Sequence, residues 1–284
     1  MANLLKGKEV ADAINAKSKQ EVETLKEKGI IPTLAILRVG EKENDLSYER
    51  GTIKRCQEVG VKVIVNALQE NVTKEEFYNK LNELNNDSNI HAILVFRPLP
   101  KELDNELARN SVLAMKDVDG SSDASLSGVF TNSNVGYAPC TAQAAMEILN
   151  YYNIDVKGKN VVVIGRSLVV GKPLSMLLLN SNATVTICHT KTVNIKEITK
   201  KADIVIAATG QMESLNKDYF NEKQTIIDVG ISWNANKNKL CGDVLFEDVE
   251  PNVLNITPVP GGVGSVTTSV LVSHVVEACK KQIN

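Results

Sequence analysis

Residues 161–173 form the stretch of the chain whose residue types most clearly suggest chemistry. They read Val-Val-Val-Ile-Gly-Arg-Ser-Leu-Val-Val-Gly-Lys-Pro, so a run of β-branched residues stops at Gly165 and a helix is predicted to open near Gly171 and Pro173. Backbone N–H groups at a helix N-terminus bind anions, and the helix dipole favours negative charge there. The segment therefore indicates a cofactor that carries a pyrophosphate. The spacing is not G-x-G-x-x-G, so tight strand–helix packing alone is the alternative.

A second polar segment, 188–192, follows the next predicted strand. NAD sites usually have an Asp or Glu about here, which binds the ribose 2′-hydroxyl. This chain has His189, Thr190 and Lys191 instead, and Arg166 lies in the glycine turn. Such side chains suit a 2′-phosphate, so we expect NADP. A solvated polar loop is the alternative interpretation.

Glycines also close three later predicted strands, at Gly210, Gly230 and 261–262. Glycine at the end of a strand lets the backbone come close to a ligand. Several such ends in one half of the chain are best explained by an extended cofactor that lies across them.

The composition excludes several classes of protein. The chain has 284 residues and a net charge of -2, which gives no electrostatic reason to expect nucleic acid or a membrane surface as partner. The five cysteines form no C-x-x-C pair, which favours reduced thiols and no metal site. No signal peptide is recognisable, and no apolar run approaches the ~18 residues of a membrane span. We therefore expect a cytoplasmic protein.

Helix and strand signals alternate along the chain, which predicts an α/β protein with parallel strands. Helices are expected over 10–29, 47–60, from Thr73 with a capping box to Glu76, over 141–152, and around 270–279. Strands are expected over 34–37, 61–65, 90–96, 161–164, 183–188, 203–208, 225–229 and 255–258, and a loop over 119–136. We predict two α/β domains that meet near residue 140, the second with a Rossmann-like parallel sheet, and a ligand cleft between them.

Several longer motifs occur in an order that resembles one family. In the second half they are GRSLVVGKP at 165–173, ATVTICHTKT at 183–192, DVG at 228–230, GDV at 242–244 and PVPGGVGSVT at 258–267. In the first half they are Ser47-Tyr48, Pro98-Leu99-Pro100, KDVDG at 116–120 and Pro139-Cys140-Thr141. Over nearly the whole chain, these motifs resemble the methylenetetrahydrofolate dehydrogenase/cyclohydrolase family.

The resemblance implies an enzyme of one-carbon metabolism. It implies NADP-dependent oxidation of 5,10-methylenetetrahydrofolate to the methenyl form, which most members then hydrolyse to 10-formyltetrahydrofolate in the same pocket. It also implies a homodimer, and a final helix that returns to the first domain. The expected domains are therefore 1–140 plus 272–284, which bind folate and carry catalysis, and 141–271, which bind NADP.

The resemblance further implies the site residues. Tyr48 stacks on a ring of the folate, and Asp119 accepts hydrogen bonds from the pterin. The folate contacts are Tyr48, Val95, Arg97, Asp119, Pro260, Gly261 and Gly262. The cofactor contacts are Thr141, Gly165, Arg166, Ser167, Val170, Gly171, His189, Thr190, Thr209, Gly210, Gly230 and Ile231. The alternatives are an ordinary half-buried helix residue for Tyr48 and a helix N-cap for Thr141, while His91 and His274 are expected to be structural.

Two catalytic positions depart from the family pattern. A Lys usually follows the helix Tyr by four residues, but here Thr52 follows Tyr48. The strand before Pro-Leu-Pro usually ends Gln-Leu, but here it ends Phe96-Arg97. The catalytic set is thus Tyr48, Asp119, Thr52 and Phe96, and two polar groups associated with hydrolysis are replaced.

The chemistry of the two reactions indicates which activity the two replacements should reduce. Loss of hydride leaves a cation delocalised over two nitrogens, so the protein mainly has to position the reacting carbon. Hydrolysis needs a general acid/base, worth about 10²–10⁴-fold, which a Thr hydroxyl does not replace. We therefore expect a dehydrogenase with weak or absent cyclohydrolase activity. The alternative is a fully bifunctional enzyme in which Arg97 compensates, although strand alternation should point Arg97 away from Phe96.

Two other classes of protein are alternatives. A shikimate-type dehydrogenase would also have two domains and use NADP, but it needs a Lys–Asp proton-transfer pair that we do not find. A non-catalytic nucleotide-binding protein would explain the two changed positions. The retained Tyr48 and Asp119 argue against it.

Overall fold

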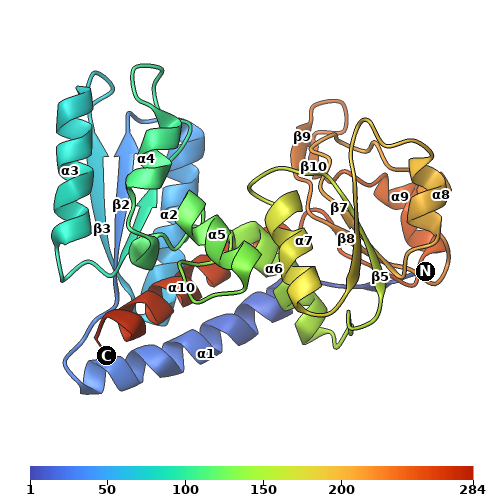
Figure 1. Cartoon of the computed structure of the whole chain (residues 1–284), viewed down its shortest axis with the longest axis horizontal. Coiled ribbons are helices and arrows are strands. Elements are labelled where there is room, and N and C mark those ends of the chain that lie inside the picture. The colour runs from blue at the N-terminus through green and yellow to red at the C-terminus, as the bar shows by residue number, and fades with distance from the viewer. Residues whose placement is uncertain (284) are drawn as a thin grey trace. The chain divides into compact units, whose positions relative to one another are not determined.

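The computed structural model describes residues 1–283, which form two α/β units (Figure 1). The central unit comprises Met1–Asp12 and Thr141–Thr267, and the N-terminal unit comprises Ala13–Cys140 and the chain from Thr268 onward. Each unit is built on a parallel sheet, which confirms the α/β prediction. The expected domains placed the first twelve residues in the N-terminal half, whereas they group with the central unit.

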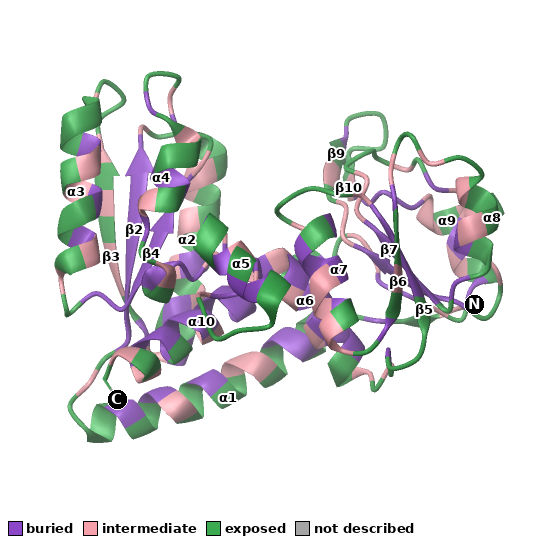
Figure 2. Ribbon diagram, viewed as in Figure 1, coloured by how far each residue is buried: buried purple, intermediate pink, exposed green. Residues whose placement is uncertain are grey.

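In the N-terminal unit, three parallel strands lie in the order β3-β2-β4. They are β2 (Thr33–Val39), β3 (Lys62–Leu68) and β4 (Ala92–Val95). Strand β2 pairs along both edges and is buried at every position, as Figure 2 shows. The unit's helices are α2 (Glu43–Val59), α3 (Lys74–Asn86), α4 (Asn105–Ser111) and α5 (Asp123–Thr131).

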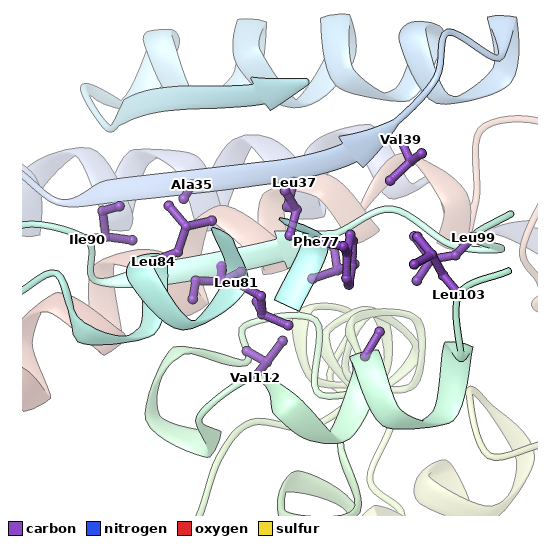
Figure 3. Close-up of a cluster of buried hydrophobic side chains, with 13 residues drawn as sticks. Ala35, Leu37, Val39, Phe77, Leu81, Leu84, Ile90, Leu99, Leu103 and Val112 are labelled. Carbon is purple, nitrogen blue, oxygen red and sulfur yellow. The ribbon is translucent and has the colours of Figure 1, made fainter. Parts of the chain in front are cut away.

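The core of this unit lies between the sheet and helix α3 (Figure 3). Phe77, Leu81 and Leu84 recur at helical spacing on α3 and are almost completely buried against side chains such as Leu37 of β2. Burial of each such side chain contributes roughly 1.5–3 kcal/mol, so this face fixes α3 on the sheet. The predicted capping box at Thr73 is confirmed, since its side chain and that of Glu76 each bond the other's backbone N–H.

The central unit has a six-stranded parallel sheet in the order β1-β11-β8-β7-β5-β6. Its strands are β1 (Asn3–Leu4), β5 (Asn160–Ile164), β6 (Thr184–Cys188), β7 (Ile204–Ala207), β8 (Thr225–Asp228) and β11 (Asn255–Ile256). Its helices are α7 (Gly171–Asn180), α8 (Ile195–Lys200) and α9 (Phe246–Val249). Strand β5 has β6 on one side and β7 on the other, which creates a topological switch point where α/β proteins bind ligands.

Three helices run from one unit into the other along the chain: α1 (Gly7–Glu27), α6 (Cys140–Tyr151) and α10 (Thr267–Gln282). Helix α1 is the longest in the described chain, with 21 residues, and its Lys and Glu side chains alternate with the buried Val10, Val22 and Leu25. Over residues 1–283, no helix is both long enough and apolar enough to cross a membrane.

The prediction of a loop over 119–136 is wrong for its middle part, where α5 forms. The Ser122 hydroxyl accepts a hydrogen bond from the Ser125 N–H and caps the helix, and Asn132 ends it in the left-handed conformation. Small polar residues that read as a loop therefore serve here as helix ends.

Two pieces of strand were also missed. A hairpin of β9 (Ser232–Asn234) and β10 (Lys239–Cys241) follows β8, and β1 pairs in parallel with β11. Strands of two or three residues give almost no periodic signal, so the sequence pattern could not mark them.

Candidate functional site

The central unit has a pocket of about 420 Å³ at the carboxyl ends of β5, β6 and β7, which is the switch point of its sheet. The residues that line it are Ile164, Gly165, Arg166, Ser167, His189, Thr190, Thr192, Ile195, Ala208, Thr209, Gln211, Ser214, Leu215 and Tyr219. The glycine turn and the polar 188–192 segment, far apart in the sequence, thus meet at one pocket.

The glycine turn is fixed by close backbone packing. Gly165 has φ +136°, and a Cβ there would lie 2.0 Å from the Ala208 carbonyl oxygen. A Cβ on Gly171 would lie 2.2 Å from the carbonyl oxygen of Gly165. Both glycines are therefore required by packing, which places the first turn of α7 directly behind the pocket. The turn itself is closed by the Ser167 hydroxyl, which accepts a hydrogen bond from the Val170 N–H at 3.1 Å.

The polar wall of the pocket follows β6. The His189 N–H donates to the Thr192 hydroxyl at 2.8 Å, and Nδ1 of His189 accepts from the Lys191 N–H at 3.1 Å. Arg166 is the permanently charged residue of the lining, and no Asp or Glu belongs to it. The lining is therefore suited to an anionic ligand group and lacks the carboxylate that an NAD ribose would use.

Six of the predicted cofactor residues line the pocket: Gly165, Arg166, Ser167, His189, Thr190 and Thr209. Six others do not belong to the lining: Thr141, Val170, Gly171, Gly210, Gly230 and Ile231. Thr141 lies inside the first turn of α6, which begins at Cys140, so it is not the N-cap that we considered. Ile195, Ser214 and Tyr219 line the pocket without having been predicted. They come from α8 and from the chain after β7, and no glycine or charge pattern marks them.

A polar cluster in the N-terminal unit gathers the predicted folate residues. The rings of Tyr48 and Phe96 lie 5.6 Å apart between centroids, at 48°. Nη2 of Arg97 lies 3.4 Å from Oδ2 of Asp119. Asp119 also acts electrostatically on Tyr48, so these four side chains belong to one cluster. Tyr48 keeps 39% of its surface exposed, so part of this residue is accessible to a ligand.

Helix α2 carries Tyr48, Thr52 and Cys56 on one face, four residues apart. The helix is anchored by a largely buried ion pair in which Arg38 Nε donates to Glu49 Oε2 at 2.8 Å. Lys42 Nζ, just before the helix, donates to the Pro98 carbonyl at 2.9 Å. These two contacts tie the Tyr48 helix to the end of β2 and to the chain that follows β4.

Thr52 is completely buried. Its hydroxyl has no partner with full hydrogen-bond geometry in the described part of the chain, although it lies near enough to the Tyr48 hydroxyl to lower the pKa of that group. A buried neutral hydroxyl supplies neither a positive charge nor a base.

The residues that precede Asp119 are fixed by hydrogen bonds. Lys116 Nζ donates to the carbonyls of Leu84 and Asp87, at 3.1 and 2.8 Å, which closes the end of α3. The Asp117 carboxylate accepts from the N–H groups of Ser121 and Ser122 and from the Ser125 hydroxyl, and thereby holds the start of α5.

The carbonyl of Val118 is fixed as well. It accepts from Nδ1 of His274 at 2.8 Å and from the Cys140 thiol at 3.3 Å. His274 is thus structural, as expected, but it acts on the residue next to Asp119. Sequence reasoning missed this support, because it depends on side chains distant in the sequence.

The electrostatics of the cluster keep its groups protonated or neutralised. Burial of the Tyr48 hydroxyl, and then the neighbouring Cys140 and Asp119, raise the pKa of Tyr48 above its ordinary value. Burial and then Asp117 raise the pKa of Asp119, while Arg97 opposes both effects. Arg97 is therefore the group that favours the charged form of Asp119.

The expected direction of Arg97 is wrong. Strand β4 ends at Val95, so the alternation of side chains does not extend to Phe96 and Arg97. Phe96 contacts Tyr48 and Arg97 contacts Asp119, so both reach the same cluster.

Other predicted folate residues lie elsewhere. Val95 is part of the buried core of the N-terminal unit. Pro260, Gly261 and Gly262 belong to the central unit, where the Gly261 carbonyl accepts from the Gly7 N–H at 2.7 Å. Gly261 has φ +102°, and a Cβ on Gly262 would lie 2.5 Å from the Pro258 carbonyl oxygen, so the backbone itself requires both glycines. The contact of these three residues with folate stays a prediction.

Comparison with known proteins places these observations in context. Residues 5–119 match the model for the tetrahydrofolate dehydrogenase/cyclohydrolase catalytic domain, and residues 139–283 match the NAD(P)-binding domain of the same family. The chain is 50% identical over 281 residues to the bifunctional protein FolD of Clostridium botulinum, strain Okra, and the match covers 99% of each chain.

Solved structures give the same result. The bifunctional methylenetetrahydrofolate dehydrogenase/cyclohydrolase of Campylobacter jejuni is 38% identical, with a TM-score of 0.95 and 99% of each chain covered. The Trypanosoma brucei enzyme, solved with NADP and an inhibitor, is 32% identical, with a TM-score of 0.91 over 100% of this chain and 99% of that one.

Proposed function

This chain belongs to the tetrahydrofolate dehydrogenase/cyclohydrolase family, and on that premise we propose that it oxidises 5,10-methylenetetrahydrofolate to 5,10-methenyltetrahydrofolate with NADP. The family assignment confirms the resemblance identified in the sequence motifs. The central unit is the NAD(P)-binding part, and the N-terminal unit binds the folate.

The choice of NADP is supported by the lining of the central pocket. Arg166, His189 and Thr190 supply positive charge and hydrogen-bond donors for a 2′-phosphate. No carboxylate lines the pocket to accept from a free ribose hydroxyl. We expect NADP to support turnover at much lower concentration than NAD. Equal turnover with NAD at the same concentration would contradict this choice.

The bound cofactor supplies the hydride acceptor, and the protein supplies position. Asp119 accepts from the donor groups of the pterin, while the exposed face of Tyr48 stacks against a ring of the folate. The high pKa of Tyr48 keeps its hydroxyl protonated, so it acts as a hydrogen-bond donor. None of these residues has to remove a proton for hydride transfer to proceed.

Weak or absent cyclohydrolase activity is the finer part of the proposal. Thr52 is buried and neutral, and Phe96 packs an apolar ring against Tyr48. Neither side chain can activate water or move a proton. A second enzyme would then complete the conversion to 10-formyltetrahydrofolate.

Full bifunctionality is the second candidate, because Arg97 lies at the cluster and contacts Asp119. A guanidinium supplies a permanent positive charge to a developing anion, but it does not release a proton at physiological pH. Arg97 therefore replaces the charge of a lysine and not its acid/base capacity, which leaves dehydrogenase activity with little hydrolysis as the better interpretation.

A product analysis tests both candidates. The protein is incubated with methylenetetrahydrofolate and NADP, and NADPH, methenyl and 10-formyl forms are followed together. We expect NADPH and the methenyl form to accumulate, and added methenyltetrahydrofolate to decay no faster than without enzyme. Formation of the 10-formyl product in step with NADPH would establish bifunctionality, and no NADPH at all would contradict the proposed oxidation.

The double variant Thr52→Lys/Phe96→Gln tests whether these two residues cause the weak or absent cyclohydrolase activity. We expect it to gain hydrolysis by about 10²-fold or more, because it restores an ammonium and an amide at the two changed positions. The variant Thr52→Ser, which keeps a hydroxyl, is the matched control and should gain none. Retained NADPH formation shows that each variant is folded. A folded double variant without added hydrolysis would show that these two residues are not the cause.

The chain is further proposed to act as a homodimer in the cytoplasm, as the family resemblance implies. Sedimentation of the purified protein, with and without folate, tests the first part.

A further inference from the structure

Two buried aspartates lie behind the cofactor pocket and belong to motifs that the proposed function does not use. Asp228 ends strand β8 and Asp243 follows strand β10, so the β9–β10 hairpin separates them in the sequence. Their exposed fractions are 3% and 1%. No lysine or arginine pairs with either carboxyl group among the ion pairs of the described chain, although both are ordinarily charged at neutral pH.

Backbone amides hold the two carboxyl groups. Asp228 accepts from the N–H groups of Gly230, Asp243 and Val244, at 3.0, 3.1 and 2.9 Å. Oδ2 of Asp243 accepts from the N–H of Thr209, and from that of Gly210 at 3.1 Å. The pair therefore connects the end of β8 with the 242–244 segment and with the loop after β7, which carries the pocket residue Thr209.

The glycines of the two motifs are required by the same pair. A Cβ on Gly230 would lie 2.3 Å from Oδ1 of Asp243, and a Cβ on Gly242 would lie 2.0 Å from Oδ2 of Asp228. Each carboxyl group thus packs on the glycine beside the other aspartate. Because of these contacts, no side chain larger than that of glycine fits at position 230 or 242. This explains the glycine in both the DVG and the GDV motif.

We propose that Asp228 and Asp243 are positioning residues of the cofactor pocket, in which Asp243 fixes the Thr209 loop and the protonation of Asp228 sets how tightly the pocket holds its anionic cofactor. The inference rests on the proposed binding of NADP. It adds a pH dependence that arises from groups outside the pocket lining.

The charge of the pair changes near neutral pH. The pKa of Asp228 is raised to about 7. Burial is the largest cause and the charge of Asp243 adds to it, while hydrogen bonds from three backbone N–H groups oppose both. Oδ1 of Asp243 has no hydrogen-bond partner within residues 1–283. Asp228 is therefore protonated below pH ~7 and carries a negative charge above it. The added charge opposes an anion at the neighbouring strand ends, so the affinity for NADP should fall about 3- to 10-fold as pH rises.

The other groups around Asp228 do not titrate in this range. Strand β11 contributes Thr257, whose hydroxyl accepts from the Asp228 N–H, and the loop after β7 contributes the neutral Thr209. His189 is an ionisable residue that lines the pocket itself. The experiment therefore has to separate His189 from Asp228.

Isothermal titration of the full chain with NADP at pH 5.5 and 8.5 tests the proposal. The affinity of wild type for NADP should be lower at pH 8.5 than at pH 5.5. Asp228→Asn should lose most of this difference in affinity, whereas His189→Gln should retain it. Asp155→Asn, which removes an exposed carboxylate of the same unit, is the matched control and should behave as wild type. A full pH difference in a folded Asp228→Asn, or none in wild type, would overturn the proposal.

A second variant covers the case in which Asp228→Asn does not fold. Asp243→Asn keeps an acceptor for the Thr209 loop and removes the charge that raises the pKa of Asp228, so the change in affinity should move to lower pH. An unmoved midpoint would contradict the proposal. No NADP binding by wild type at any pH would instead contradict the proposed function.

Discussion

Arg97 shows how one side chain changes the interpretation of its surroundings. In the sequence, Arg97 follows Phe96, which stands where the family usually has a glutamine. Strand alternation predicted that the Arg97 side chain points away from Phe96. In the structure it lies 3.4 Å from the carboxylate of Asp119 and opposes the burial that raises the pKa of that group. The residue thus favours the charged form of Asp119.

Removal of Arg97 should therefore change how the enzyme depends on pH. In Arg97→Leu the pKa of Asp119 rises, since burial and Asp117 then act unopposed, and Asp119 is protonated at higher pH. We expect the acidic limb of kcat/KM for methylenetetrahydrofolate to move to higher pH. KM should rise about tenfold, the equivalent of one charge-assisted hydrogen bond of about 1.4 kcal/mol.

Arg97→Lys is the matched control for this experiment, because it keeps the charge and loses the planar guanidinium. It should restore the acidic limb at least in part. An unchanged pH profile in Arg97→Leu would show that Arg97 does not influence Asp119.

At the scale of elements, helix α2 is placed by contacts at its first turns. The Arg38–Glu49 pair joins it to β2, with 9% and 12% of the two side chains exposed, and Glu49 is the neighbour of Tyr48. A second ion pair on the same helix, Arg50–Glu43, is 62% and 78% exposed. The two pairs have similar distances and very different surroundings.

Glu49→Gln should therefore destabilise the protein far more than Glu43→Gln. The first change leaves the buried Arg38 charge without its partner and is expected to lower the free energy of unfolding by about 3 kcal/mol. The second removes a solvated pair worth about 0.5 kcal/mol or less. Urea unfolding of both variants checks this, and equal losses would contradict the role given to the buried pair.

The elements also show what the sequence could and could not predict. Long periodic segments and glycine turns were predicted correctly, because their signals are local. Helix α5 and the hairpin β9–β10 were missed, because Ser122 caps a helix that lacks apolar periodicity and the two hairpin strands are only three residues each.

The candidate site was predictable in a similar way. Gly165 and Arg166 lie in one contiguous motif, so the sequence identified them. Tyr219 and Ile195 reach the pocket only through the packing of α8 and the chain after β7, which no local pattern encodes.

At the scale of the whole molecule, buried carboxylates make stability depend on pH. The folded pKa of Asp228, about 7, lies above its ordinary 3.8. Its contribution is therefore fully present below pH ~4 and is lost as pH rises through 7. A shift of this size corresponds to about 4 kcal/mol for one fully buried group.

Comparison of wild type with Asp228→Asn isolates this contribution, because other carboxylates titrate equally in both proteins. The difference in unfolding free energy between the two proteins should decline by about 4 kcal/mol between pH 4 and 8. Urea unfolding at several pH values provides the measurement. A difference that stays constant with pH would show that Asp228 does not titrate as inferred.

The β9–β10 hairpin has one more consequence, which is optical. It carries Trp233, the single tryptophan of the chain, with 59% of its surface exposed. Excitation at the red edge of protein absorption excites only tryptophan. The fluorescence therefore comes from the central unit, and the N-terminal unit contributes none. The emission of the native protein, without label or mutation, reports events at the hairpin between the DVG and GDV motifs.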